Sequence, residues 1–299
     1  MKVLNSILNL LDKQNSKSVY LSIFRVYISF HVMKKILFSL PYFNLIYGEN
    51  SFAVSKSVDF YGLLQLDFFR EYNFTLAYIL LILSIMMMFG IGKNITIIFL
   101  FLGLEILQRM NPYFLNGGDN LLKFVMLYLC LCNCYGYFCF KNRAIKAGSI
   151  DNYLTNIGCY SIIIHLCLIY FISALHKIHS DVWFNGIATY YTLSIERFSG
   201  TDLNQYLTQN GYFVLISTYF TLFWELTFSF FVFKKDFKLF YIIGGIILHM
   251  FIYIFMMIHD FQILFISIYG FFYSDNELLY FKSKIKTYFI KIKYEKNSY

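Results

Sequence analysis

The sequence predicts an all-α fold, a polytopic bundle of transmembrane helices with about eight spans, in a range of about six to nine. Hydrophobic residues make up 59% of the 299 residues and charged residues only 14%, whereas a soluble domain carries about 25% charged residues. Apolar runs of about 20 residues, the length that crosses a bilayer, also recur along the chain. A multi-pass membrane protein without a large soluble domain is therefore expected.

Eight stretches are apolar enough to be candidate spans. In chain order they cover residues 19–41, 74–92, 94–110, 120–140, 157–177, 211–233, 239–258 and 260–274. The third and the last are short for a span. For these two, a tilted span, a re-entrant segment and one half of a tight hairpin are open alternatives.

Charged residues outside the spans predict the orientation of the bundle. Basic and acidic residues alternate from loop to loop, with Lys13, Lys93, Arg143, Lys235 and Lys284 in one set of loops and Glu49, Asp67, Asp119, Asp181 and Asp202 in the other. Because cytoplasmic loops carry an excess of lysine and arginine, both termini are expected in the cytoplasm and the long loops 42–73 and 178–210 outside. The basic residues that give the formal charge of +8 lie in short loops between the apolar runs and in the C-terminal tail. The lipid bilayer is therefore the expected partner, and nucleic acid is not.

Three regions are expected along the chain. Residues 1–18 form a cytoplasmic N-terminal segment, residues 19–274 the transmembrane bundle, and residues 275–299 a basic cytoplasmic tail. No cleavable signal peptide is expected, because the first apolar stretch, Val3 to Leu11, is short and ends at a charged pair. Residues 280–294 of the tail mix apolar side chains with lysines, which predicts an amphipathic helix on an anionic leaflet.

Ionisable side chains inside apolar spans are costly, so each is a candidate for function. The candidate catalytic residues are Lys177 at the end of the fifth span and the deeper Glu225 and His249. Candidates for lining or supporting a cavity open toward the outer leaflet are Arg25, His31, Glu105, Arg109, His176 and Trp183. The alternatives are structural: ion pairs such as Glu105 with Arg25 or Lys34, or lysines that extend toward the membrane surface.

Lys177 has a distinctive setting, between His176 and His179 and shortly before Asp181 and Trp183. A lysine at the edge of an apolar cavity, beside groups that can become cationic, is a candidate general base. The alternative is an ordinary interfacial lysine beside an aromatic anchor.

The cysteines predict helix packing and no metal site. Four lie at the cytoplasmic end of the fourth span and two in the fifth: Cys130, Cys132, Cys134 and Cys139, then Cys159 and Cys167. On a helix Cys130 and Cys134 would share a face while Cys132 would point elsewhere, a poor arrangement for tetrahedral zinc.

The segment from Tyr170 to Lys177 carries a family resemblance. It reads Tyr-Phe-Ile-Ser-Ala-Leu-His-Lys and is followed by Trp183, Gly186, Ala188, Tyr190 and Tyr191. This pattern resembles the signature of the membrane domain shared with vitamin K-dependent gamma-carboxylases, known in bacteria as the horizontally transferred transmembrane domain. Phe24-Arg25, Glu225, and His249 followed by Phe261 resemble further positions of the family, so that the resemblance covers about residues 20–270.

The resemblance implies a role for Lys177. In the carboxylases the corresponding lysine is taken to be the base that deprotonates a reduced quinone, so the resemblance implies Lys177 as base and a reduced quinone as cofactor. The chain ends soon after the last span, without the large extracytoplasmic domain of the carboxylases, and glutamate carboxylation is therefore not expected.

In size and loops the chain looks most like the sporulation-delaying protein B type within this family. That likeness implies a protein of the bacterial cytoplasmic membrane that matures or modifies an exported antimicrobial or toxin precursor peptide, together with a small partner protein. Two alternatives stay open: a quinone-dependent, carboxylase-like membrane enzyme with another substrate, and a non-enzymatic immunity or transport protein.

Overall fold

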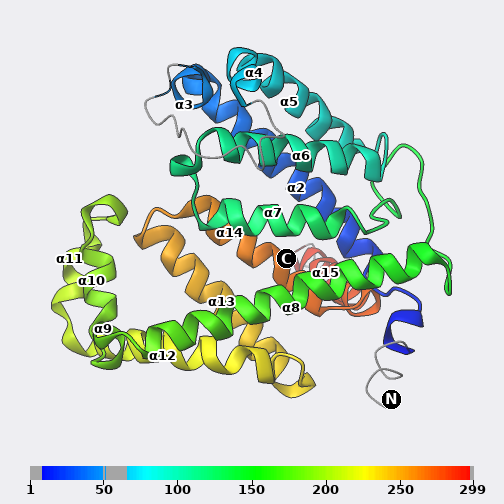
Figure 1. Cartoon of the computed structure of the whole chain (residues 1–299). Coiled ribbons are helices and arrows are strands. Elements are labelled where there is room, and N and C mark those ends of the chain that lie inside the picture. The colour runs from blue at the N-terminus through cyan, green and yellow to red at the C-terminus, as the bar shows by residue number, and fades with distance from the viewer. Residues whose placement is uncertain (1–8, 50, 52–65, 297–299) are drawn as a thin grey trace. The chain divides into compact units, whose positions relative to one another are not determined.

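The computed structural model describes residues 9–49, 51 and 66–296, and every regular element in these ranges is a helix (Figure 1). The all-α prediction is confirmed for this part of the chain. Much of the expected outer loop 42–73 and most of the first apolar stretch from Val3 lie outside the described residues. Within these ranges three helices are long and apolar enough to cross a membrane, α8 (Ile150–Ile178), α12 (Gly211–Phe231) and α13 (Lys235–Phe255).

The chain divides into two compact units. The first comprises Met1–Phe114, Met126–Cys159 and Tyr273–Tyr299, and the second comprises Leu115–Val125 and Tyr160–Phe272. The remaining helices of the first unit are α2 (Ser18–Ser39), η1 (Leu40–Tyr42), α3 (Phe43–Tyr47), α4 (Leu66–Glu71), α5 (Asn73–Phe89), α6 (Asn94–Met110), η2 (Pro112–Phe114) and α15 (Asp275–Lys296). The second unit adds α9 (Asp181–Phe184), α10 (Ala188–Ser194), η3 (Glu196–Phe198), α11 (Leu203–Gln209), α14 (His259–Ile268) and η4 (Tyr269–Phe272). Two helices, α7 (Gly117–Leu129) and α8, contribute residues to both units.

Four predicted spans agree closely with observed helices, namely α2, α5, α6 and α12. The helix α6 begins and ends at the predicted residues, 94 and 110. The last predicted span, 260–274, is shorter than expected, because α14 has 10 residues and gives way to a 3-10 turn at Tyr269. The tail helix α15 includes the predicted segment 280–294.

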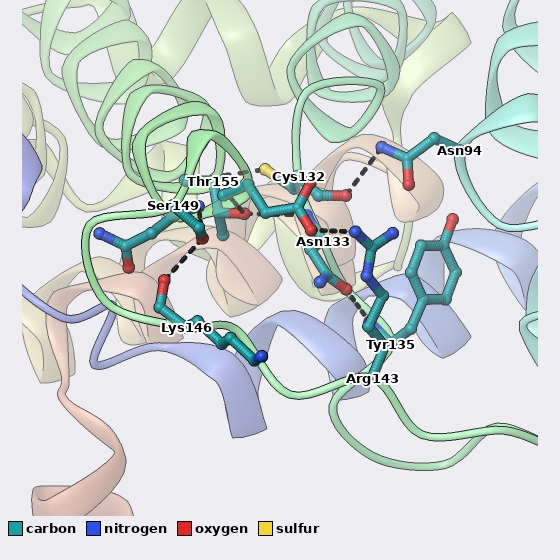
Figure 2. A network of polar contacts seen from close by, with 10 residues as sticks. Asn94, Cys132, Asn133, Tyr135, Arg143, Lys146, Ser149 and Thr155 are labelled. Atoms are coloured by element: carbon teal, nitrogen blue, oxygen red, sulfur yellow. Dashed lines mark hydrogen bonds and ion pairs between the residues drawn. The ribbon is translucent and has the colours of Figure 1, made fainter.

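The predicted helix 120–140 is wrong beyond its first half. The observed helix α7 has 13 residues and ends at Leu129, and residues 130–149 contain no helix. Asn94 donates to the carbonyl oxygens of Cys130 and Cys132 at 2.9 and 3.1 Å. The contact of Asn94 with Cys132 is drawn in Figure 2, as is the hydrogen bond that the backbone N–H of Asn133 donates to the Thr155 hydroxyl at 2.9 Å. Because side chains from distant helices take these backbone groups, the helical ladder stops, and Cys130 and Cys134 share no helical face.

At one end of the first unit, three segments expected in the cytoplasm lie together. The Asp275 carboxylate accepts hydrogen bonds from the backbone N–H groups of Ser18 and Val19 at 2.9 and 3.0 Å. It thereby satisfies free donors at the start of α2, where a negative charge also favours the helix dipole. The backbone N–H of Asn15 donates to Asn152 Oδ1 at 2.9 Å. The N-terminal segment and the starts of α8 and α15 therefore meet.

Segments expected outside meet in the same unit. Asn111 donates to the carbonyl oxygen of Ile46 at 2.8 Å, and Arg70 donates to that of Met110 at 3.1 Å. Two short helices within the expected loop 42–73, α3 and α4, are thus tied to the end of α6.

Candidate functional site

Two candidate catalytic residues meet in the second unit. Lys177, one residue before the end of α8, forms an ion pair with Glu225 of α12. The Glu225 side chain is 9% exposed and the Lys177 side chain 21%. The carboxylate is therefore the buried partner, and the lysine is the partner that a second molecule can reach.

Trp183 of α9 completes this group of residues. The Lys177 ammonium lies 4.8 Å from the centre of a Trp183 ring. An aromatic face and a carboxylate both stabilise the charged form of lysine. The three side chains come from α8, α9 and α12 and form one compact cluster, named the Lys177 cluster below.

Gly186 allows the α9–α10 segment to pack on α12. Its φ is +74°, and a Cβ at this position would lie 2.5 Å from Leu215 Cδ1 and 2.9 Å from Tyr219 Cε2. Only glycine adopts such a conformation without steric strain. The Tyr219 hydroxyl donates to the carbonyl oxygen of Phe184 at 2.7 Å, which holds α9, and with it Trp183, against α12.

His249 lies in a separate polar cluster of the same unit. Its Nε2 and the Tyr170 hydroxyl are 2.5 Å apart, and its Nδ1 is hydrogen-bonded to Gln262 Oε1. The Tyr170 hydroxyl is also 2.5 Å from the Tyr269 hydroxyl. These four residues, of which three were not predicted, are named the tyrosine–histidine chain below.

Sequence offers a signal for only one of the three missed residues. Tyr170 precedes Lys177 by seven residues, and this spacing places both on one face of α8. Gln262 and Tyr269 lie in short helices with no charge pattern that marks them. Their polar role depends on which residues the fold brings beside them.

Aromatic rings connect the two clusters. The Tyr170 ring packs against Trp224 and Phe228 of α12, with ring centres 5.0 and 4.8 Å apart. Trp224 is the neighbour of Glu225 in the chain. Trp224 therefore links the two clusters, through its place beside Glu225 in the chain and through its ring contact with Tyr170.

Arg25, a predicted supporting residue, has a structural role in the first unit. Its guanidinium donates to the carbonyl oxygens of Met87, Met88, Tyr137 and Phe138 at 2.7, 3.1, 3.2 and 2.6 Å. Met87 and Met88 belong to the last turn of α5, whose carbonyl groups have no partner within the helix. Glu105 forms an ion pair with Arg109 of its own helix, in which Oε2 and Nη2 are 3.7 Å apart.

The other predicted supporting residues are divided between the units. His31 is buried in the first unit, where its ring centre lies 5.9 Å from that of Tyr27. His176 lies in the second unit and is exposed beside Lys177. The predicted cavity residues therefore form more than one local environment.

The second unit contains an apolar cavity of about 490 Å³ between α10 and α12. Its lining residues are Gly186, Ile187, Tyr190, Thr208, Gly211, Tyr212, Val214 and Leu215. None of the three predicted catalytic residues lines it. It shares Gly186 with the turn that carries Trp183.

All six cysteines are free thiols, and Cys132, Cys134, Cys159 and Cys167 are buried. Across the described ranges no group of three histidine, cysteine or acidic side chains is placed to hold a metal ion. Comparison of the chain with protein-family models, with curated proteins and with solved structures found no match. The Lys177 cluster joins a lysine and a carboxylate, two side chains that can exchange a proton, within hydrogen-bonding distance.

Proposed function

We propose that this chain is a membrane factor that helps to mature or modify an exported peptide through the Lys177 cluster. The observation that carries this proposal is the ion pair of Lys177 and Glu225, which are 48 residues apart in the sequence and come from different helices. Paired ionisable groups that are partly buried among apolar residues are more typical of functional sites than of membrane-facing surfaces. Both residues also stand at positions that resemble motif positions of the horizontally transferred transmembrane domain, and we propose that the chain is related to this family.

The proposed setting is the bacterial cytoplasmic membrane, with about eight spans and both termini in the cytoplasm. Three helices with the length and composition of spans support this setting. The meeting of the N-terminal segment with the starts of α8 and α15 supports a common side for these basic regions. In this orientation α15 lies at the inner leaflet, and the loop 178–210 faces outward, where an exported peptide and a small partner protein have access.

The proposed chemistry is proton abstraction by Lys177. A protonated lysine has no lone pair, so it must first lose a proton, and Glu225 is the acceptor within reach. Transfer of one proton from Nζ to Oε1 leaves a neutral amine and a carboxylic acid. The amine then takes a proton from an acidic C–H, N–H or O–H group of the substrate. Before that step the total charge of the pair is unchanged, because the proton has only moved from one member to the other.

A quinone-dependent membrane enzyme is the second candidate. The apolar cavity beside Gly186 favours it, because a quinone ring and its tail are apolar. The cavity lining would hold a reduced quinone, which would supply electrons. A fluorescence titration of the purified protein with a reduced quinone analogue tests this candidate. Gly211→Leu, at a lining position where a Cβ meets no atom within 4 Å, should fill part of the cavity and abolish the binding.

The test of the proposed function is mass spectrometry of the peptide secreted by the producing strain. Deletion of the gene should abolish the mature peptide, and the wild-type gene should restore it. Lys177→Ala should fail to restore it, whereas Lys234→Ala should succeed. Lys234 is a matched control, because its ammonium also lies 4.8 Å from an aromatic ring, that of Phe231, but has no carboxylate partner in the described part of the chain.

Three outcomes would count against the proposal. An unchanged mature peptide after gene deletion would exclude a role in maturation. Full restoration by Lys177→Ala, with the variant inserted in the membrane, would exclude Lys177 as the base. Protection of a sensitive strain that carries no precursor gene would instead favour the immunity function.

A further inference from the structure

One tight turn joins the apolar cavity of the second unit to the Lys177 cluster. Gly186 lines the cavity, and its backbone N–H donates to the carbonyl oxygen of Trp183 at 3.2 Å. The centre of a Trp183 ring in turn lies 4.8 Å from the Lys177 ammonium. A group held in the cavity therefore keeps the atoms bonded to it near the ion pair, which favours a reaction there by proximity.

The cavity has the size and lining of a site for one large apolar group. Its volume of about 490 Å³ lies in the usual range of small ligand sites. The lining residues Tyr190 and Tyr212 are 46% and 82% exposed, so a second molecule can reach their rings. Gly211 adds open space, because a Cβ there would meet no atom within 4 Å. Exposed tyrosine rings bury a large apolar area against a partner at little cost in entropy.

The segment 178–210, which supplies half of the lining residues of this cavity, is acidic. Asp181 of α9, Glu196 of η3 and Asp202, which precedes α11, are all exposed. Arg197 is the single basic residue of the segment, although the whole chain has a formal charge of +8. A molecule that approaches the cavity therefore meets negative charge, which attracts cations and repels anions.

We propose that the cavity docks a cationic peptide by one large apolar side chain and holds the adjoining peptide backbone near Lys177. The acidic segment disfavours anionic lipid, and it disfavours a second copy of this chain, which would present the same acidic segment. It contributes nothing to the binding of a quinone, which carries no positive charge. The inference deepens the proposed function and rests on it for the source of the peptide.

The test is fluorescence anisotropy of labelled synthetic peptides with the full chain in phosphatidylcholine nanodiscs, and empty nanodiscs are the blank. The first probe has one phenylalanine between lysines in a glycine–serine background. Replacement of its phenylalanine by serine should weaken binding about tenfold to about a hundredfold, the effect of burying one large apolar side chain. Replacement of its lysines by glutamates should abolish binding, and added salt should weaken it. Equal binding of the phenylalanine and serine probes, or of the basic and acidic probes, would overturn the inference.

Substitutions in the chain locate the bound peptide. Gly211→Leu should weaken binding of the phenylalanine probe at least about tenfold, because Gly211 begins α12 without a positive φ and its new side chain enters the cavity. The double variant Glu196→Gln with Asp202→Asn should weaken it severalfold and reduce its dependence on salt. Asp236→Asn is the matched control, because Asp236 is an exposed acidic residue in the first turn of α13, outside the lining and the segment 178–210. Undiminished binding to a folded Gly211→Leu variant would overturn the inference, and the serine probe decides the matter if that variant does not fold.

Competition and peptide yield distinguish the remaining outcomes. Displacement of the phenylalanine probe by a reduced quinone analogue would assign the cavity to the quinone and overturn the inference. Failure of the proposed function looks different: the probe would bind as expected, but deletion of the gene would leave the secreted peptide unchanged. If Lys177→Ala abolishes maturation while Gly211→Leu sustains it, the proposed function stands and the docking inference is wrong.

Discussion

Removal of either member of the Lys177–Glu225 pair should destabilise the second unit, and by unequal amounts. Lys177→Met leaves a carboxylate side chain that is 9% exposed without its cation. Loss of one partner from a buried pair costs about 3–5 kcal/mol. Glu225→Gln leaves an ammonium that is 21% exposed and still faces Trp183, so the loss should be about 2 kcal/mol, that of one charged hydrogen bond. The lysine variant should therefore be the less stable one.

The assay is unfolding of the chain in mixed micelles of rising denaturing-detergent content, followed by tryptophan fluorescence. The only two tryptophans of the chain, Trp183 and Trp224, both lie in the second unit, so the signal reports on that unit. The double variant should be more stable than the sum of the single effects predicts, by about 1–3 kcal/mol. Lys234→Met is the control and should change little. A coupling energy near zero, or a greater loss for Glu225→Gln, would refute the reasoning.

Two further predictions concern backbone geometry, and both are measured by thermal melting followed by circular dichroism. Arg25→Lys should destabilise the first unit by about 3 kcal/mol, because one ammonium cannot replace a fork that reaches four carbonyl oxygens; an unchanged melting temperature would contradict this. Gly186→Ala should cost about 1 kcal/mol for its positive φ and about 1–3 kcal/mol more for the clash with Leu215. Gly148→Ala is the control, because Gly148 has a φ of +69° and no atom lies within 4 Å of its Cβ position. It should show only the cost of the positive φ. Equal effects in the two glycine variants would exclude the clash with Leu215.

Most helix boundaries could be predicted because local chemistry sets them. The helix α6 lies between two markers that are visible in the sequence, the turn with Gly90 and Gly92 and the Asn111-Pro112 pair. Both glycines have positive φ, which stops α5. The false helix at 130–140 shows the limit of such reasoning. Apolar composition continues there, but Asn94, 36 residues earlier than Cys130, takes the carbonyl group.

The candidate site was predictable to the extent that burying charge is costly. This rule selected Lys177 and Glu225, which the fold pairs. Trp183, which lies against the lysine, was selected by its position shortly after Lys177 in the sequence. The rule could not select Tyr170 or Gln262, because neither carries a charge. Uncharged polar residues are common in apolar helices, and only tertiary structure shows which of them bond to one another.

The rule that burying charge is costly also selected Arg25. The difference between Arg25 and Lys177 refines this rule. Arg25 is completely buried, and the two terminal nitrogens of its guanidinium bond backbone carbonyl oxygens. A group engaged in this way has no acceptor and cannot exchange a proton, so its charge supports the backbone. Lys177 bonds another ionisable group, which can take its proton, and it keeps donors for a second molecule. The chemical nature of the partner, more than the depth of the charge, therefore separates a structural cation from a candidate for catalysis.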